Sequence, residues 1–389
     1  MTPAARVQAG IELLDLIIAA ARGQGACADR IIAEWFKTRR YMGSGDRRAV
    51  RELVYGAVRA CGEIPVSGRA AMLRLGQGDP AIVQLFDGSN HAPASIASGE
   101  AVASAGIAPR WLEAKLADSG IAGDEAAALL GRAPLDVRIN RLKPAPELPV
   151  VGAATQAPDA LRFPAGTPVE QWETYQTGQI EVQDTGSQLC CQALAARPGE
   201  LVIDLCAGAG GKTLALAAAM DNKGRVIAAD TDRGRLSRLP PRAARAGALN
   251  VETRLLNPGR EAEALADLAG LADAVLVDAP CSGTGTWRRN PEVRWRLSAA
   301  ELARLTALQL RLLDLAASLV RPGGRLIYVT CSLLDAEGAD QAEAFLTRHP
   351  DWRAQPPHLP AGTPRGCGLR LSPGSDQTDG FFIACLSAP

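Results

Sequence analysis

The spacing of apolar residues divides the chain into three regions with different predicted structures. Residues 1 to 130 place apolar side chains three and four positions apart, which is the period of an α-helix with one buried face. In the third helical segment Val50, Val54 and Val58 fall on one face. The spacing predicts an all-helical domain with helices at Ala5–Ala21, Ala26–Arg39 and Asp46–Cys61.

The second region, residues 131–185, is rich in proline and contains one short run typical of a strand, Asp136–Leu142. Proline interrupts helices and interior strands, so this composition favours short elements joined by loops. We expect a small subdomain here that connects the regions on either side.

The third region, residues 186–389, alternates strand-like and helix-like runs, which predicts an α/β fold with a doubly wound, mostly parallel sheet. Pro240 and Pro241 lie within the second helix, so we expect a break there. Two runs in the tail, Cys367–Leu371 and Phe381–Leu386, are expected to add two strands, one of them antiparallel. The earlier strands are predicted at Leu201–Cys206, Arg225–Asp230, Val251–Leu256, Ala274–Asp278 and Arg325–Thr330, and the helices at Leu214–Met220, Arg233–Ala246, Glu261–Leu268 and Ala299–Val320.

Composition and charge limit the class of protein. With 389 residues, 47% hydrophobic and 22% charged, the chain has globular proportions and a length that fits two or three domains. The formal net charge is zero, which at first argues against a nucleic-acid-binding protein. However, Arg22–Arg74 holds eleven basic and five acidic residues, a net charge of +6, and Arg288–Arg296 holds four arginines and one acid. Each stretch is either a solvated helix face or a path for phosphate groups.

The nine cysteines show neither a CxxC pair nor the spacing of a metal finger. An odd number of scattered cysteines, with no signal-peptide pattern, predicts reduced thiols in a cytoplasmic protein without a bound metal. The apolar stretch Ile11–Ala21 is too short to cross a membrane and contains Asp15. We therefore expect no membrane span.

A glycine-rich turn in IDLCAGAGGKT, Ile203–Thr213, follows a predicted strand and opens a helix. Glycines allow a ligand to approach the backbone closely, and the amides at a helix start favour a polar group. The turn is not a phosphate-binding P-loop, because Cys206 stands where that motif needs its first glycine. Asp230 ends the next strand, 19 residues after Gly211, at the distance of an acid that binds ribose hydroxyls. The pair predicts a nucleoside-containing cofactor, and the lack of a phosphate-specific feature favours S-adenosylmethionine over NAD.

Two further motifs place a cysteine just beyond the carboxyl end of a predicted strand. Cys281 lies in VLVDAPCSGTG and Cys331 lies in YVTCS, 50 residues later. Open α/β sheets bind ligands at this edge, and neighbouring strands would bring the two thiols together. A thiolate is a strong nucleophile, although a single cysteine in a sheet is more often a packing residue. Two cysteines beside a glycine-rich loop favour covalent catalysis.

The motifs DLCAGAGGKT, DAPCSGTG and TCS, in this order and spacing, resemble those of the RNA cytosine-5 methyltransferases of the bacterial ribosomal RNA methyltransferase B and NSUN group. Most of the chain shares the resemblance, and the catalytic half does so most specifically. Other matching segments are Glu181–Asp184 with Ser187 and Gln188, Arg288–Glu292, Asp379–Phe382, Arg138–Asn140 and Asp46–Gly56.

The resemblance implies three domains and an RNA partner. Residues 1–130 are similar to a NusB-like helical RNA-binding domain, and residues 131–185 to the connecting subdomain of the family. Residues 186–389 are similar to a class I, Rossmann-like, S-adenosylmethionine-dependent methyltransferase domain. We expect a monomer that acts on a single-stranded or flippable cytosine in structured RNA.

The resemblance also implies a role for each candidate catalytic residue. Cys331 matches the nucleophile that attacks carbon 6 of cytosine, which makes carbon 5 reactive enough to accept a methyl group. Cys281 matches the cysteine that resolves the adduct, acting as the general base or assisting it. Asp278 would hold the amino group and ring nitrogen 3 of the base, or contact the cofactor. Lys212 would stabilise the base or its ribose.

Two positions depart from the family pattern. Ala209 stands in the glycine-rich loop where the family usually has proline. The aspartate that contacts adenine is absent, with Pro258 at its position, and Asn257 is the candidate to replace it. The candidate cofactor-binding residues are Cys206, Ala207, Gly208, Ala209, Gly210, Gly211, Lys212, Asp230, Asn257 and Asp278.

The motifs do not encode the target RNA, so two substrates remain open. We expect ribosomal RNA, with transfer RNA as the alternative. A non-catalytic RNA-binding factor in ribosome assembly would keep the fold without turnover, but the presence of both Cys281 and Cys331 argues against it. A nucleotide hydrolase built on Gly211-Lys212-Thr213 lacks the required first glycine.

Overall fold

The computed structural model describes residues 1–23 and 25–389, which form two compact units. The first unit contains Met1–Gly131 together with Thr286–Ser298. The second contains Arg132–Gly285 and Ala299–Pro389. The segment 286–298, which the sequence analysis places in the catalytic domain, therefore belongs structurally to the amino-terminal unit.

The described residues of the first unit form helices and loops, as the apolar spacing predicts. The three helices expected near the amino terminus are present, and their buried faces share one apolar core. The helices are α1 Pro3–Arg22, α2 Ala28–Lys37, α3 Ser44–Ala60, α4 Gly68–Gly78, α5 Pro80–Val83, α6 Arg110–Asp118 and α7 Gly123–Ala128.

Arg294 and Trp295, in the 3-10 turn η4 (Pro291–Trp295), tie the late segment into this unit. Trp295 belongs to the same apolar core as α1 to α4. The buried Arg294 guanidinium donates hydrogen bonds to the carbonyls of Val58 at 2.6 Å and Cys61 at 2.8 Å, at the carboxyl end of α3. A cation at this end complements the helix dipole and supplies further donors to the carbonyls there.

A four-stranded antiparallel sheet begins the second unit, where the sequence indicated a single strand. Its order is β2-β3-β1-β4, and β1 pairs with both β3 and β4. The strands β2, β3 and β4 have two to four residues each, which is too short for an alternation of apolar and polar residues to show in the sequence. The strands are β1 Leu135–Ile139, β2 Ala153–Ala154, β3 Ala160–Phe163 and β4 Ile180–Val182, with η1 Val169–Gln171 and α8 Glu173–Gln176 between the last two.

The main sheet has the order β11-β12-β13-β9-β8-β5-β6-β7, with β10 paired to β13. The five strands predicted first, β5 to β9, pair in parallel. Of the two predicted tail strands, β13 runs antiparallel to both β9 and β12, as expected. The strands are β5 Leu201–Asp204, β6 Arg225–Asp230, β7 Val251–Leu255, β8 Ala272–Asp278, β9 Val320–Thr330, β10 Arg353–Ala354, β11 Thr363–Arg365, β12 Gly368–Leu371 and β13 Phe381–Ser387.

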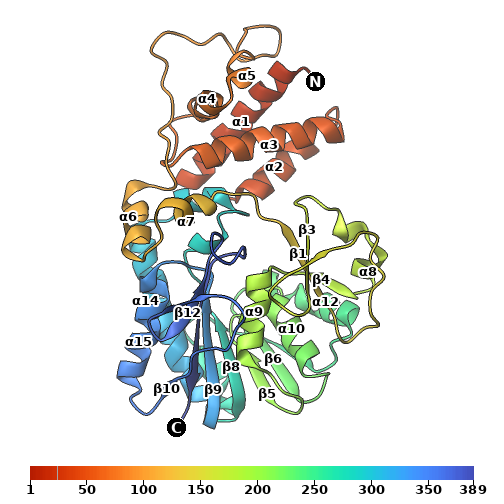
Figure 1. Cartoon of the computed structure of the whole chain (residues 1–389), viewed down its shortest axis with the longest axis vertical. Helices are drawn as coiled ribbons and strands as arrows, with labels where there is room; N and C mark the ends of the chain where they lie inside the picture. The colour runs from red at the N-terminus through yellow and green to blue at the C-terminus, as the bar shows by residue number, and fades with distance from the viewer. Residues whose placement is uncertain (24) are drawn as a thin grey trace. The chain divides into compact units, whose positions relative to one another are not determined.

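Helices cover both faces of this sheet, so the fold is Rossmann-like (Figure 1). Successive strand residues enter opposite cores: Val202 packs with α9, α10 and α12, whereas Ile203 packs with α14 and α15. Strands that are apolar on both faces therefore read as continuous apolar runs. The helices are α9 Thr185–Leu194, α10 Gly211–Ala219, α11 Arg233–Leu236, α12 Leu239–Ala246, α13 Glu261–Ala264, α14 Ala299–Leu319 and α15 Ala339–Arg348, with the 3-10 turns η2 Ala266–Leu268, η3 Thr284–Thr286 and η5 Asp335–Glu337.

The break expected in the second helix is present, between α11 and α12. The chain restarts as a helix at Leu239, so Pro240 and Pro241 occupy the first turn, where proline is tolerated. The sequence analysis missed α9 and α15. Across the described residues, the helices lack the length and hydropathy of a membrane span, and no group of three or more metal-ligating side chains is found.

Candidate functional site

The glycine-rich turn lies between β5 and α10, at the carboxyl edge of the parallel strands. Gly208 has φ +56° and Gly210 has φ +86°, values that side chains rarely allow. A Cβ on Gly208 would come within 2.5 Å of the Arg235 guanidinium, and one on Gly210 would lie 2.1 Å from a methyl group of Leu239. Both positions therefore require glycine for conformation, and at Gly210 the buried Leu239 also leaves little space for a Cβ.

Hydrogen bonds to neighbouring elements fix the shape of this turn. Asp230, at the end of β6, accepts from the Gly208 amide at 2.7 Å and from the Asp232 amide at 2.7 Å. On the other side, Arg242 of α12 donates to the Ala209 carbonyl at 2.6 Å. The turn is thus held in one conformation by β6 and α12.

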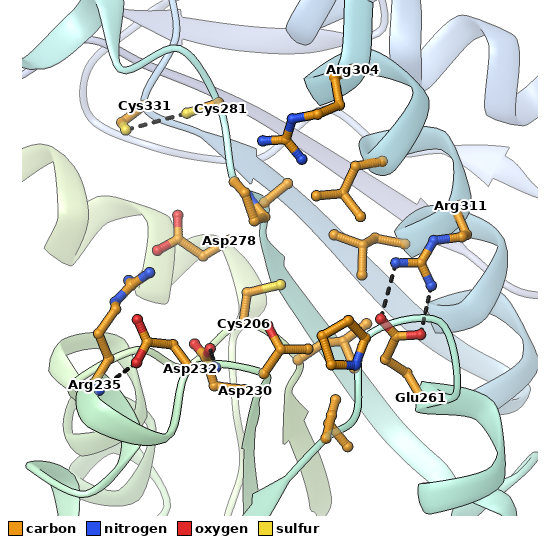
Figure 2. Close-up of a pocket in the computed structure, with 18 residues that line it drawn as sticks. Cys206, Asp230, Asp232, Arg235, Glu261, Asp278, Cys281, Arg304, Arg311 and Cys331 are labelled. Carbon is orange, nitrogen blue, oxygen red and sulfur yellow. Dashed lines mark hydrogen bonds and ion pairs between the residues drawn. The ribbon is translucent and has the colours of Figure 1, made fainter. Parts of the chain in front are cut away.

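A cavity of about 640 Å³ opens beside the turn, within the second unit. Figure 2 shows both thiols at the top of this cavity, Asp230 near the bottom and Asp278 between them. The lining combines apolar carbons with acidic and basic groups. The lining residues are Leu205, Cys206, Asp230, Thr231, Asp232, Arg235, Leu256, Pro258, Glu261, Asp278, Ala279, Pro280, Cys281, Arg304, Leu308, Arg311, Leu312 and Cys331.

Five of the residues singled out in the sequence line this cavity: Cys206, Asp230, Asp278, Cys281 and Cys331. The rest of the proposed cofactor set lies outside the lining. Asn257 is exposed, and Pro258 forms the wall at this point, so a cofactor contact by Asn257 remains a prediction. The others outside the lining are Ala207, Gly208, Ala209, Gly210, Gly211 and Lys212.

The two thiols come together as the sheet topology predicts. Their strands, β8 and β9, are parallel neighbours, and the sulfur atoms of Cys281 and Cys331 lie 3.4 Å apart. The hydrogen bond with Cys331, together with burial, raises the pKa of the Cys281 thiol well above its usual value. Cys281 therefore keeps its proton at neutral pH and has it available for a partner.

Lys212 reaches the site through Asp278. Its ammonium group lies 2.7 Å from the Asp278 carboxylate and 5.4 Å from the centre of the Phe381 ring. Burial is the largest single influence and acts to lower the pKa of Lys212. The charge of Asp278, its hydrogen bond and the neighbouring Cys190 and Cys191 together outweigh burial, so the pKa is raised. Lys212 is therefore a fixed cation that orients Asp278 at the cavity wall.

Glu337 holds the loop that carries Cys281, a role that the sequence motifs did not reveal. This carboxylate is completely buried. It accepts from the Ser282 amide at 2.9 Å and from the Gln309 side chain at 3.1 Å, and it also bonds the Ser282 hydroxyl. Gln309 in turn donates to the Pro280 carbonyl at 2.9 Å. An acid five residues after the TCS motif was the available signal.

Asp204, at the end of β5, is buried beneath the turn. One of its oxygens accepts from the Thr213 hydroxyl at 2.6 Å, and the other has no partner among the described residues. Burial raises the pKa of Asp204 to about 7. A carboxyl group in this environment changes its charge near neutral pH.

Helix α14 and the turn after β7 supply a wall of the cavity that sequence reasoning missed. Arg304, Leu308 and Arg311 follow one another at helical spacing, and Arg311 forms a bidentate ion pair with Glu261 at 2.6 and 2.9 Å. Arg304 and Arg311 lie seven residues apart in a predicted helix, and this spacing could have indicated two basic groups on one helix face. Their basic groups make this wall suited to a polar ligand.

Comparison with known proteins places the second unit in a family. A family model described as 16S rRNA methyltransferase RsmB/F matches residues 191–387. The chain is 37% identical over 292 residues to the ribosomal RNA small subunit methyltransferase B of Xanthomonas campestris, a match that covers 72% of this chain and 66% of that protein. With a Salmonella arizonae relative of the same name the match covers 52% of the relative, so the chain spans about half to two thirds of the curated relatives it matches.

Two solved structures share the fold. The crystal structure of PH0851 superposes with a TM-score of 0.76 at 25% identity and covers 99% of both chains. A methyltransferase homologue from Pyrococcus horikoshii gives a TM-score of 0.57 at 26% identity, covering 72% of this chain and 99% of that one.

Proposed function

Because the chain belongs to the 16S rRNA methyltransferase RsmB/F family, we propose that it is an S-adenosylmethionine-dependent RNA methyltransferase that forms 5-methylcytosine. We propose ribosomal RNA as the substrate, with the base unstacked into the cavity. One observation carries the proposal. Asp230, positioned for a ribose, and the paired thiols of Cys281 and Cys331 line the same cavity.

The residues beside the glycine-rich turn fit the cofactor. The turn contributes Cys206 to the cavity lining, and Asp230 supplies carboxylate oxygens for ribose hydroxyls. Leu256 and Pro258 offer an apolar wall for the adenine. S-adenosylmethionine, when bound, supplies the methyl group.

Cys331 starts the reaction on the base. Its thiolate attacks carbon 6, a sulfur–carbon bond forms, and the electron pair of the carbon 5–carbon 6 bond becomes available at carbon 5 for methylation. The proton retained on Cys281 can form a hydrogen bond to a thiolate on Cys331 at the observed 3.4 Å. The assignment of Cys331 as the nucleophile rests on its match to the cysteine of the family's TCS motif.

Release requires two bonds to break. The carbon 5 proton passes to a base. Cys281, which holds its own proton in this structure, either assists that base or first loses its proton and then acts as the base itself. The electron pair then restores the carbon 5–carbon 6 double bond, and the sulfur–carbon bond breaks to return the Cys331 thiolate. Asp278, held by Lys212 at 2.7 Å, is placed at the cavity wall to accept a hydrogen bond from the cytosine amino group.

Basic side chains of the first unit provide a path for the RNA backbone. Its helices α2 and α3 contain much of the +6 stretch identified in the sequence. Transfer RNA remains a second candidate substrate, because the catalytic residues do not select between the two RNAs.

The cysteine roles are tested by incubating purified protein with S-adenosylmethionine and a ribosomal RNA transcript. Cys331→Ala should abolish methylation and any covalent adduct. Cys281→Ala should accumulate an adduct that migrates slowly on a denaturing gel, because release is impaired. Cys367→Ala, whose thiol lies outside the cavity, is the matched control. Methylation by Cys331→Ala would overturn the assignment.

The base and the RNA are tested by bisulfite sequencing of total RNA from cells with and without the gene. Loss of one 5-methylcytosine in ribosomal RNA is the expected result, and loss in transfer RNA would select the second substrate. An unchanged pattern would favour a non-catalytic role in ribosome assembly.

A further inference from the structure

A second cavity, of about 500 Å³, shares no lining residue with the cavity that holds the two thiols. It is bounded by β1, the loop before β3 and the helices α9 and α10. Six of its lining residues are alanines, whose small side chains leave the space open. The lining residues are Arg138, Arg141, Ala157, Pro158, Asp159, Gln188, Cys191, Gln192, Ala195, Ala196, Ala215, Ala218, Ala219 and His358.

Arg138 is the unusual member of this wall. Only 5% of the residue is exposed, and its Nε donates to the Gln183 side chain at 2.8 Å. Among the described residues no hydrogen bond from its two terminal nitrogens is found, and neither nitrogen is among the fully buried unpaired atoms, although Arg138 lines the cavity. The Gln183 amide also donates to the Ser187 hydroxyl at 3.2 Å, so the guanidinium is held in a fixed orientation.

The protein supplies little negative charge to balance Arg138. Glu181 lies directly opposite on β4, but its two oxygens already pair with Arg242 at 3.0 Å and with Arg245. Asp159, the acid in the cavity wall, pairs with Arg141 at 2.8 Å. Four arginines therefore share two carboxylates, which leaves a net local charge of +2.

The neighbouring thiol does not provide the missing charge. Burial raises the pKa of Cys191 to about 12, so its sulfur is neutral near pH 7. Burial also lowers the pKa of Arg138 from its ordinary value, which shows the cost of placing this cation here. A buried guanidinium without a counter-charge is destabilising unless an anion joins it.

We propose that this cavity binds a phosphate group, with the guanidinium of Arg138 as the principal contact. The planar fork of a guanidinium matches two oxygens of a phosphate, and the alanine-lined space accommodates the attached organic part. The phosphate comes either from a free mononucleotide or from the backbone of the RNA substrate. Only the RNA backbone, as a source of the phosphate, rests on the proposed function.

The binding test uses the full-length protein and two glutamine variants. Inorganic phosphate and adenosine monophosphate are titrated calorimetrically into wild type, Arg138→Gln and Arg141→Gln. Arg138→Gln should lower affinity roughly tenfold to a hundredfold, as expected for hydrogen bonds to a charged group. Arg141→Gln is the matched control, because that side chain is 64% exposed and already paired, and it should change affinity less.

Thermal unfolding distinguishes a ligand site from a structural arginine. In phosphate-free buffer Arg138→Gln should unfold at a temperature no lower than wild type, because it removes an uncompensated buried charge. Added phosphate should raise the Tm of wild type but not of the variant. A variant with a lower Tm in phosphate-free buffer, combined with a wild type that binds neither probe, would overturn the proposal.

The salt dependence of RNA binding identifies the source. If the phosphate belongs to the RNA, Arg138→Gln should reduce the slope of log affinity against log salt by about 0.7 to 0.9. An unchanged slope with lost mononucleotide binding supports the free nucleotide instead. These measurements do not depend on methylation activity, so a negative result would not contradict the proposed methylation.

Discussion

The buried carboxylate of Glu337 gives the sharpest test of how the thiol site is positioned. Glu337→Gln keeps the shape of the side chain but removes its charge. Hydrogen bonds to a charged group contribute about 1.5–3 kcal/mol and neutral ones about 0.5–1.5 kcal/mol, so the free energy of unfolding should fall by about 1–2 kcal/mol. For a unit of this size, that lowers the Tm by roughly 2–8 °C.

Glu337→Ala should cost more, because it leaves the Ser282 amide, which is hydrogen-bonded to this carboxylate at 2.9 Å, without an acceptor. We expect a loss of roughly 3 kcal/mol. Since Ser282 follows Cys281 directly, the loop should shift and kcat should fall about tenfold to a hundredfold, with the KM for S-adenosylmethionine nearly unchanged.

The assays are differential scanning calorimetry and initial-rate methylation of the transcript used above. Glu170→Gln, at an exposed glutamate outside the site, is the control and should match wild type. The Glu337→Gln variant should keep much of the kcat that the Glu337→Ala variant loses. An alanine variant with wild-type Tm and kcat would refute the positioning role.

Two further predictions concern the turn and the strand beneath it. The pKa of Asp204 is about 7 in the folded protein, whereas the ordinary value for an aspartate is 3.8. Between about pH 4 and pH 7 the folded protein therefore holds a proton on this group that the unfolded chain has lost. The free energy of unfolding should fall as the pH rises through this window. Urea unfolding of Asp204→Asn should show a flatter profile, and an unchanged profile would contradict this. Gly210→Ala, with φ +86° and a Cβ only 2.1 Å from Leu239, should lose about 2 kcal/mol of stability and weaken cofactor binding in calorimetric titrations. Gly45→Ala in α3, with open space at its Cβ, should be neutral or slightly stabilising, and equal effects of the two substitutions would count against the reasoning.

The main sheet could be predicted from the sequence because its strands are buried on both faces. Val202 and Ile203 enter different cores, which produces the continuous apolar runs read from the sequence. The small sheet could not be predicted in the same way. A strand such as Ala153–Ala154 is too short to show a period, and it forms only because β3 lies beside it.

The candidate site was predictable where a motif marks the end of a strand. Cys281 and Cys331 could be paired because their strands are neighbours in a parallel sheet. The roles of Glu337 and of the arginines of α14 were not predicted, since they depend on side chains that pack from other elements. The glycines of the turn lie outside the cavity lining, so their contact with the cofactor stays a prediction, and hydrogen bonds hold the turn to β6 and α12.

The discontinuous first unit has a consequence for biosynthesis. Its core includes Trp295, and Arg294 bonds the last carbonyls of α3, so both are needed to complete it. When residue 131 leaves the ribosome, that core still lacks a part encoded more than 150 residues later. The amino-terminal unit therefore finishes folding only after β5 to β8 have been synthesised, and a gene fragment cut at residue 131 would encode an incomplete domain.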